Sequence, residues 1–395
     1  MTTATSGGST DRVDPHRLLD WFRERQEEMV AAVAELAAIE SPSGDGGAQE
    51  PARAFLTGAL TAAGFTVERL EGRDGCDHLL ARMPDLPGDG PGQLVMGHLD
   101  TVWPVGTLTE MPVEEIDGRL HGPGTFDMKG GLIQALFAFR AIGELGLELP
   151  ASPSFLIVAD EEIGSPDSRR YTMEAAGEAA RCFVVEPAFG PEGELKTHRK
   201  GVGQFSLTVK GVASHAGLAP EAGTSAILEA SRQIERLFEL NDPERGISVN
   251  VGTVDGGLGA NVVAPEATAQ IETRVETAED AVAVEEAIKG LAPTKEECVI
   301  EVEGSFRRPP LEKTPGNRLL WEEAVAAAGE MGLALGEASV GGASDGNLTS
   351  TVTATLDGLG AVGDGAHAEY EHLVVEKLPE RAALLAALLT RPLGQ

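Results

Sequence analysis

The chain has 395 residues, which is enough for two or three domains, and 42% of them are hydrophobic, so substantial cores can be buried. Acidic residues outnumber basic residues by 63 to 31, which gives a formal net charge of -32. A surface of this charge repels nucleic acids and anionic membranes, so we expect neither as a partner.

Cysteine content and the amino terminus predict the compartment. The three cysteines, Cys76, Cys182 and Cys298, are widely spaced and form no CxxC pair, which argues against a disulfide framework and favours a reducing compartment. Residues 1–15 are polar and lack the apolar core of a signal peptide. The chain also has no run of about 18 apolar residues. We therefore expect a cytoplasmic protein with a flexible tail over 1–15.

The first 200 residues alternate between helical periodicity and short apolar strands. Apolar residues at intervals of three and four predict a helix over 16–40, and a second helix over about 50–64 ends at Gly64. A turn-rich segment follows at 85–91, and a helix is expected over 128–145. The strands expected around these segments read FTVERL, HLLARM, QLVMG, SFLIVA and CFVV. Strands that alternate with helices are typical of an α/β domain.

The pattern changes after about residue 201. Half-buried strands with the sequences GQFSLTVKG, SVNVGTVDGG and ATAQIETRVE alternate with helices at about 224–240 and 279–291, which predicts an α+β insertion that ends near Gly304. The α/β pattern then returns with a helix over about 315–331, the strand VTATLDG and an amphipathic helix over about 377–390. We therefore predict one α/β domain with a mostly parallel sheet, formed by 16–201 and 307–395 and interrupted by a smaller domain over 202–306.

Histidine and carboxylate residues recur where the predicted strands of the α/β domain end. In open α/β sheets, ligands bind beyond the carboxyl ends of the strands. Zinc requires neutral imidazoles and ionised carboxylates, and two ions that share a bridging carboxylate need about five protein ligands. Two histidines and three carboxylates meet this requirement and leave one carboxylate over. The residues in question are His98, Asp127, Glu161, Glu162, Glu186 and His367.

Two spacings within this set suggest separate roles. Glu161 and Glu162 are adjacent, so one can bind metal while the other acts as a general base. The H-x-D spacing allows Asp100 to reach the far ring nitrogen of His98 and orient it. Taken singly, a strand-end acid is more often a helix cap and a histidine is more often an ordinary hydrogen-bonded residue. We expect the latter for His16, His78, His121 and His372.

Seven segments, in chain order, resemble the signature segments of the co-catalytic zinc exopeptidase and aminoacylase family. The segments are GHLDTVWPVG, GPGTFDMKGG, ADEEIGS, VVEPA, SHAGLAPEAG, FRRPP and GDGAHAEYE. The resemblance covers about 20–390 and is greatest to the bacterial glutamate carboxypeptidase branch. Acetylornithine deacetylase, succinyl-diaminopimelate desuccinylase and peptidase T belong to the same family. The resemblance implies a zinc-exopeptidase-like catalytic domain.

The resemblance also implies a role for each residue of the strand-end set. Two zinc ions per subunit would be bound, although cobalt or manganese could be accepted. Asp127 would bridge the ions, Asp100 would orient a histidine ligand and Glu161 would be the general base. The remaining ligands would be His98 and Glu186 on one ion, and Glu162 and His367 on the other. The family also predicts a cis peptide bond, here Asp127–Met128.

The inserted domain resembles the lid of this family, which commonly forms a homodimer. The resemblance implies that His215 reaches the active site of the partner subunit and stabilises an oxyanion there. It also implies that Arg308 binds the free carboxylate of the substrate and that Asn261 and Arg274 contact substrate. The segment of His198, Arg199 and Lys200 (198–200) departs from the family pattern, so it is either an additional anion contact or part of the hinge.

These features together predict a di-zinc hydrolase that cleaves an amide bond beside a free carboxylate and releases a C-terminal amino acid. The substrate would be a small peptide. The first alternative is a deacylase of N-acyl amino acids, which uses the same residues. The second is a metal-dependent binding protein with a degenerate site. The glycine-rich segments GGLGA and GGASDGN match neither a P-loop nor a dinucleotide-binding motif.

Overall fold

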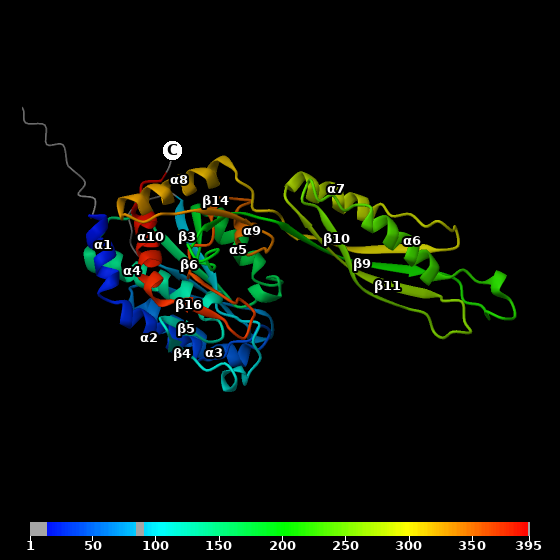
Figure 1. The fold of residues 1–395 in the computed structure, drawn as a ribbon, viewed down its shortest axis with the longest axis horizontal. Helices are drawn as coiled ribbons and strands as arrows, with labels where there is room; N and C mark the ends of the chain where they lie inside the picture. Colours follow the sequence, from blue (N-terminus) through cyan, green and yellow to red (C-terminus); the bar gives the residue numbers. More distant parts are fainter. Residues whose placement is uncertain (1–13, 84–90, 394–395) are drawn as a thin grey trace, which may run out of the picture. The chain divides into compact units, whose positions relative to one another are not determined.

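A computed structural model of the protein describes residues 14–83 and 91–393, and the chain folds as two compact units (Figure 1). Unit 2 comprises 196–317 and 338–353, and unit 1 comprises the remaining described residues. The predicted insertion over 202–306 lies within unit 2, but unit 2 extends further in both directions. Backbone bonding explains the difference, because Arg199 exchanges N–H and C=O hydrogen bonds with Leu311 and the Lys200 N–H donates to the Val340 carbonyl.

The central sheet of unit 1 is predominantly parallel, as predicted. Its strand order is β1-β2-β6-β3-β7-β14. The pairs from β6 to β14 are parallel, whereas β2 pairs antiparallel with both β1 and β6. The strands are β1 (Thr66–Leu70), β2 (His78–Arg82), β3 (Gly92–His98), β6 (Pro153–Val158), β7 (Ala179–Val184) and β14 (Ala354–Leu356).

Helices cover both faces of this sheet. They are α1 (Pro15–Arg23), α2 (Gln26–Ala37), α3 (Gly46–Ala62), α4 (Gly130–Leu145), α5 (Arg169–Gly177), α8 (Pro315–Glu330) and α10 (Leu378–Thr390). The prediction of one continuous helix over 16–40 was wrong, because Arg25 has a non-helical backbone (φ -112°, ψ 14°) that separates α1 from α2. The predicted tail over 1–15 lies mostly outside the described residues, but α1 begins at Pro15, where Asp14 caps it.

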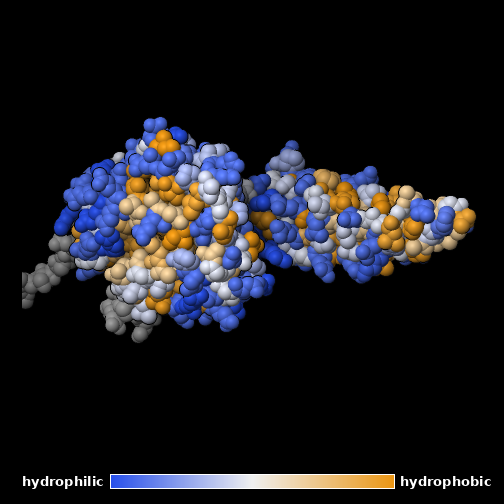
Figure 2. Space-filling model, turned by 90° about the horizontal axis from the view of Figure 1, so that it is seen from below, coloured by the Kyte–Doolittle hydropathy of each residue, from blue (hydrophilic) through white to orange (hydrophobic). Residues whose placement is uncertain are grey.

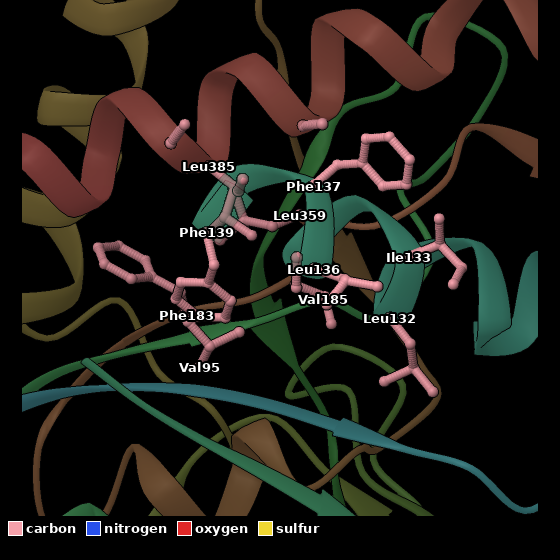
Figure 3. Close-up of a cluster of buried hydrophobic side chains, with 14 of the residues drawn as sticks. Val95, Leu132, Ile133, Leu136, Phe137, Phe139, Phe183, Val185, Leu359 and Leu385 are labelled. Carbon is pink, nitrogen blue, oxygen red and sulfur yellow. The ribbon is translucent and has the colours of Figure 1, made fainter. Parts of the chain in front are cut away.

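Helix α4 lies at the centre of the largest core. All of its residues from Gly130 to Phe139 are buried, as expected of a helix enclosed by other elements. Figure 3 shows its Leu132 and Leu136 beside Val185, with Val95 of β3 and Leu385 of α10 in the same cluster. The neighbours of Val95 in β3 point to the opposite face of the sheet, where α5 supplies part of a second core. Burial on both faces explains why these strands are continuous apolar runs.

A second, smaller sheet of unit 1 has the strand order β15-β16-β5-β4 and is antiparallel throughout. Its strands are β4 (Glu114–Ile116), β5 (Arg119–His121), β15 (Gly363–Asp364) and β16 (His372–Val374). Sequence patterning did not identify these strands because each has only two or three residues, which is too short for an alternation to be recognised.

Unit 2 contains a four-stranded antiparallel sheet with the order β10-β11-β9-β12, and helices α6 and α7 pack against it. The elements are β9 (Gly201–Lys210), α6 (Ala226–Phe238), β10 (Ser248–Gly256), β11 (Glu266–Val275), α7 (Ala278–Lys289) and β12 (Val299–Arg308). Strands β8 (Leu195–Arg199) and β13 (Glu337–Val340) pair separately, and α9 (Gly346–Thr349) follows. The predicted end of the insertion near Gly304 was wrong, because β12 continues to Arg308 as an edge strand with few apolar residues.

Among the described residues, no helix is both long and apolar enough to cross a membrane. All three cysteines are buried, and none of them is part of a disulfide.

Candidate metal centre

The strand-end residues predicted from the sequence lie together at one edge of the central sheet. Strands β6, β3 and β7 are parallel neighbours, so their carboxyl ends meet. His98 is the last residue of β3, Glu161 and Glu162 follow β6, and Glu186 follows β7. Asp127 precedes α4, and His367 lies in the loop between β15 and β16. Strand pairing therefore brings together groups that lie far apart in the sequence.

The two carboxylate oxygens of Asp127 face different histidines. Its Oδ1 lies 3.3 Å from Nε2 of His98, and its Oδ2 lies 3.6 Å from Nε2 of His367. Glu186 is on the first side, 3.6 Å from Nε2 of His98, and Glu162 is on the second, 3.0 Å from Nε2 of His367. The arrangement thus has two halves, each with one imidazole and one terminal carboxylate, and Asp127 lies between them.

The charges of these groups fit a cation. Burial raises the pKa of Glu162 to about 7. The hydrogen bond to Glu162 raises the pKa of His367 to about 9, and carboxylates raise the pKa of His98 although its burial opposes this. A proton on these imidazoles would occupy the place of a metal ion, because only a neutral imidazole binds metal. Ligand atoms of His98, Asp127 and Glu162 all lie within 4.8 Å of one another, which suits such an ion.

Asp100 lies within reach of the far ring nitrogen of His98, as the H-x-D spacing predicted, and it makes further contacts. The Nδ1 of His98 is 2.9 Å from the backbone carbonyl of Asp100, whereas the carboxylate is 3.5 Å away. That carboxylate accepts the backbone N–H groups of Glu161 and Glu162, both at 3.2 Å, and the hydroxyl of Ser43 at 2.6 Å. Asp100 therefore orients His98 through its main chain and holds the Glu161–Glu162 turn through its side chain.

Glu161 lies beside the half of the site that contains His98. Glu161 belongs to a second group of possible metal ligands. In this group, ligand atoms of His98, Glu161 and Glu186 lie within 4.8 Å of one another. The bond Asp127–Met128 is cis, which confirms the expectation from the family resemblance. A carboxylate at the position of Glu161 can accept a proton from a water molecule next to the metal ligands.

Sequence reasoning missed Glu371. Its carboxylate is 1% exposed and accepts the backbone N–H groups of Gly124, Phe126 and Asp127 at 2.9–3.1 Å. It also accepts the indole N–H of Trp103 at 2.9 Å. Burial raises the pKa of Glu371, and these N–H groups oppose the shift. The residue lies in the segment GDGAHAEYE, but nothing local distinguishes it from a solvated acid.

The substrate-binding residues predicted for unit 2 form two groups. His215 and Asn261 are neighbours, because the Ala216 N–H donates to the Asn261 carbonyl and His215 forms a bridge with Val262. The Nδ1 of His215 accepts the backbone N–H groups of Gly217 and Leu218, both at 3.1 Å. A neutral His215 therefore carries its proton on Nε2, and its side chain is exposed.

The second group surrounds the segment 341–345. Arg274 and Arg308 both pair with Val202 of β9, on opposite sides of that strand. Arg274 donates to the Gly341 carbonyl at 3.1 Å, and Arg308 lies 3.3 Å from a carboxylate oxygen of Asp345. Arg308 is 6% exposed, so a role as an ordinary surface arginine is excluded.

The basic residues at 198–200 bind acceptors of unit 2 itself. His198 lies 3.4 Å from the carboxylate of Glu276, and Lys200 lies 3.0 Å from the same group. Arg199 donates to the Gly342 carbonyl at 3.1 Å. These contacts favour a structural role within unit 2 over an additional anion contact.

Comparison with known proteins identifies the family. The model of the peptidase family M20/M25/M40 matches residues 94–391. The chain belongs to this family. Carboxypeptidase G2 of Pseudomonas sp. (strain RS-16) is 28% identical over 373 residues, which cover 93% of this chain and 89% of the relative. Succinyl-diaminopimelate desuccinylase of Gluconacetobacter diazotrophicus is 31% identical over 384 residues, which cover 90% and 95%.

Solved structures support the same fold. Aminopeptidase PepT from Bacillus cereus superposes with a TM-score of 0.72 at 23% identity, over 92% of this chain and 98% of that chain. This superposition confirms the predicted fold class, and the family model confirms the predicted family. The protein is a metallopeptidase or amidohydrolase of the M20/M25/M40 family, whose members depend on a dinuclear metal centre.

Proposed function

We propose that this M20/M25/M40 member cleaves an amide bond beside a free carboxylate and releases a C-terminal amino acid. The observation that carries the proposal is the position of Asp127, whose two oxygens face His98 and His367 on opposite sides. A binding protein with one structural ion has no need of a bridging carboxylate, whereas hydrolysis by a metal pair does. The presence of Glu161 beside this arrangement argues further against a degenerate site.

The donor set fits two zinc ions. His98 and Glu186 would bind one ion and Glu162 and His367 the other, with Asp127 between them. Imidazole and carboxylate donors suit zinc, and sites of this kind also accept cobalt or manganese. When bound, the ions would polarise the scissile carbonyl and make water acidic enough to lose a proton at neutral pH.

Glu161 is the proposed general base. Its backbone N–H is held by the Asp100 carboxylate, which fixes the turn that carries it. The carboxylate of Glu161 would take a proton from the attacking water and return it to the leaving amine. The backbone N–H of Glu162 also donates to the Asp100 carboxylate, but Glu162 would instead serve as a metal ligand.

His215 is the proposed oxyanion donor, and it would act from a second copy of the chain. The proton on its exposed Nε2 can be donated to a developing negative charge. Val202, next to Arg308, lies near one end of β9, and His215 follows the other end. The strand spans roughly 30 Å, so a small substrate held by Arg308 is out of reach of His215 of the same chain. Use of both residues on one substrate therefore requires a homodimer.

Unit 2 has features that suit this homodimer. Strand β10 is at the edge of its sheet, where unpaired backbone groups can pair with another copy. Exposed apolar side chains lie on α6 and β10, among them Ile227 (46%), Leu228 (52%) and Val254 (56%). Figure 2 shows apolar residues along the elongated part of the view, which is unit 2.

Arg308 and Arg274 are the proposed contacts for the substrate carboxylate, with Asn261 as a further contact near His215. A buried guanidinium that is already oriented by Asp345 loses little freedom on binding a carboxylate. The same feature serves an N-acyl amino acid, so the second candidate is a deacylase. The identity of 31% with a succinyl-diaminopimelate desuccinylase favours keeping this candidate.

A substrate panel with purified, zinc-loaded enzyme tests the proposal. Dipeptides and folate-like amides that end in Glu, Asp, Ala or Leu are compared with acetyl and succinyl amino acids. We expect turnover of the C-terminal amides, and we expect Glu161→Gln to reduce kcat by about 100-fold or more. Turnover of N-acyl amino acids alone would support the deacylase instead. Activity of Glu161→Gln within a few-fold of wild type would exclude Glu161 as the base.

A further inference from the structure

Four residues of the types that bind metals form one row across the small sheet of unit 1. Asp364 of β15 pairs with His372 of β16, His372 pairs with His121 of β5, and His121 pairs with Glu114 of β4. Figure 1 shows β16, β5 and β4 side by side. Side chains that are directly opposite on neighbouring strands project from the same face of a sheet. None of these residues belongs to the candidate metal centre.

The two imidazoles at the centre of the row are close enough to share an ion. Their ring centroids are 5.1 Å apart, and the ring planes are inclined by 38°. Two imidazoles that bind one zinc ion at roughly 2.0–2.1 Å place their centroids about 5 Å apart. The observed centroid spacing of His121 and His372 is therefore compatible with a shared metal ion.

Both rings can present a lone pair. The Nδ1 of His372 lies 3.0 Å from the Tyr370 carbonyl, so it carries the proton and leaves Nε2 available in the neutral form. A backbone carbonyl that accepts this proton commonly orients a metal-binding histidine. Burial lowers the pKa of His121, and His372 and Arg119 lower it further, which favours the neutral form of the ring that binds metal.

The geometry points to a second metal site, separate from the candidate metal centre, in which His121 and His372 bind a divalent transition-metal ion across β5 and β16. Imidazole pairs select zinc, nickel or copper over magnesium and calcium. Glu114, the next residue in the row, is exposed and supplies a nearby negative charge. Water would complete the coordination. Asp364 is less suitable, because its carboxylate caps the Gly365 N–H at 2.7 Å.

An ion at this position would hold together two segments that lead to the catalytic ligands. Strand β5 runs into the loop that carries Asp127, and β16 begins directly after Glu371, which binds the Asp127 N–H. Cross-linking His121 to His372 would therefore stabilise the base of both segments. We expect the ion to raise thermal stability without taking part in the reaction.

Zinc stoichiometry of the full-length, untagged enzyme tests this site. Zinc bound per chain is measured by equilibrium dialysis followed by elemental analysis, for wild type, His121→Gln and His372→Gln. Each variant should bind about one ion fewer than wild type. His198→Gln is the matched control, because it removes a histidine that pairs with Glu276 in unit 2, and it should bind as many ions as wild type. An unchanged count in both His121→Gln and His372→Gln would overturn the proposal.

A second measurement does not depend on the buried His372. Nickel is added to wild type and to His121→Gln, each loaded with only two zinc ions per chain, which is enough for the candidate metal centre alone. The altered side chain of His121→Gln is only partly buried, and the thermal midpoints of the two proteins are compared. Nickel should raise the midpoint of wild type and leave that of His121→Gln unchanged. Equal shifts in the two proteins would place the nickel elsewhere and contradict the site. Because the comparison is between variants, its outcome is independent of the substrate proposed above.

Discussion

At the scale of single residues, the candidate centre depends on two carboxylates that are not themselves proposed to bind metal. Asp100 holds the turn of Glu161 and Glu162, and Glu371 holds the loop that precedes Asp127. Each is a buried acceptor that satisfies several backbone N–H groups. Such groups fix the geometry of ligands that would otherwise repel one another, because the ligand set is mostly anionic.

Replacing Glu371 should weaken metal binding. Glu371→Gln replaces the carboxylate by a neutral amide with a single acceptor oxygen, so at least one N–H group of the 124–127 loop loses its acceptor and Asp127 is held less firmly. We expect metal affinity to fall by about 10–100-fold, measured by competition with a chromogenic chelator. Glu369→Gln, in the same loop but exposed, is the control and should have wild-type affinity. Equal affinities of the two variants would exclude a positioning role for Glu371.

His78 should make stability depend on pH. It is fully buried, its Nδ1 accepts the Ala159 N–H at 3.1 Å, and burial lowers its pKa. The unfolded chain therefore binds a proton more readily than the folded chain below about pH 6.5, so folded stability falls as the pH falls through that value. His78→Asn keeps an acceptor for Ala159 but does not titrate.

The measurement is the unfolding free energy of wild type minus that of His78→Asn, between pH 5 and 8. This difference should be constant above about pH 7 and should decrease below about pH 6.5, by at most about 1.4 kcal/mol per pH unit. A difference that stays constant down to pH 5 would show that His78 does not titrate in this range.

At the scale of elements, the site depends on how closely α4 approaches the sheet. A Cβ added at Gly131 would lie 2.0 Å from the backbone carbonyl oxygen of Val185, so only glycine fits there. Gly97 of β3 is similarly confined, with a Cβ position 2.7 Å from the side chain of Leu132. The two glycines permit the close packing that places Asp127, just before α4, beside His98 at the end of β3.

Two glycines of α4 therefore predict opposite effects of the same substitution. Gly131→Ala forces α4 away from β7 and should destabilise the protein by several kcal/mol, at the high end for single substitutions. Gly143→Ala has nothing within 4 Å of its new methyl group and should be neutral or stabilise by up to about 1 kcal/mol. Thermal midpoints of the two variants test this, and similar midpoints would show that α4 can move.

At the scale of the whole molecule, metal binding and folding are linked in one of the two units. All the proposed ligands belong to unit 1, and so do the three tryptophans, Trp21, Trp103 and Trp321. Bound metal stabilises only the unit that binds it. Tryptophan fluorescence therefore reports on the metal-binding unit, whereas far-UV circular dichroism reports on both.

Chelation should lower the thermal midpoint measured by tryptophan fluorescence by roughly 5–10 °C, and zinc should restore it. A component of the circular dichroism melt that belongs to unit 2 should not move. A fluorescence midpoint that is insensitive to the chelator would contradict metal binding in unit 1. The chain has a high negative charge, and bound metal ions also stabilise unit 1 by relieving the repulsion among the ligand carboxylates.

Much of this organisation was predictable from the sequence. Periodicity located most strands and helices, because helix and strand repeats depend on neighbours along the chain. Residue type and strand-end position singled out the six candidate ligand and base residues, and ordered motifs indicated the family. Prediction was poorest for strands that are short or exposed, namely β4, β5, β15 and β16 of the small sheet and the edge strand β12.

What the sequence determined by itself is therefore local: which segments form helices and strands, which residues can bind metal, and which family the motifs indicate. Only the tertiary structure decided which groups meet. Strand order places Glu162 and Glu186 on either side of His98. Burial lets Glu371 accept backbone N–H groups of the loop that carries Asp127. Cross-strand pairing places His121 next to His372. The physical reason is that these contacts join residues far apart in the chain, so they depend on packing and strand register, which no local pattern specifies.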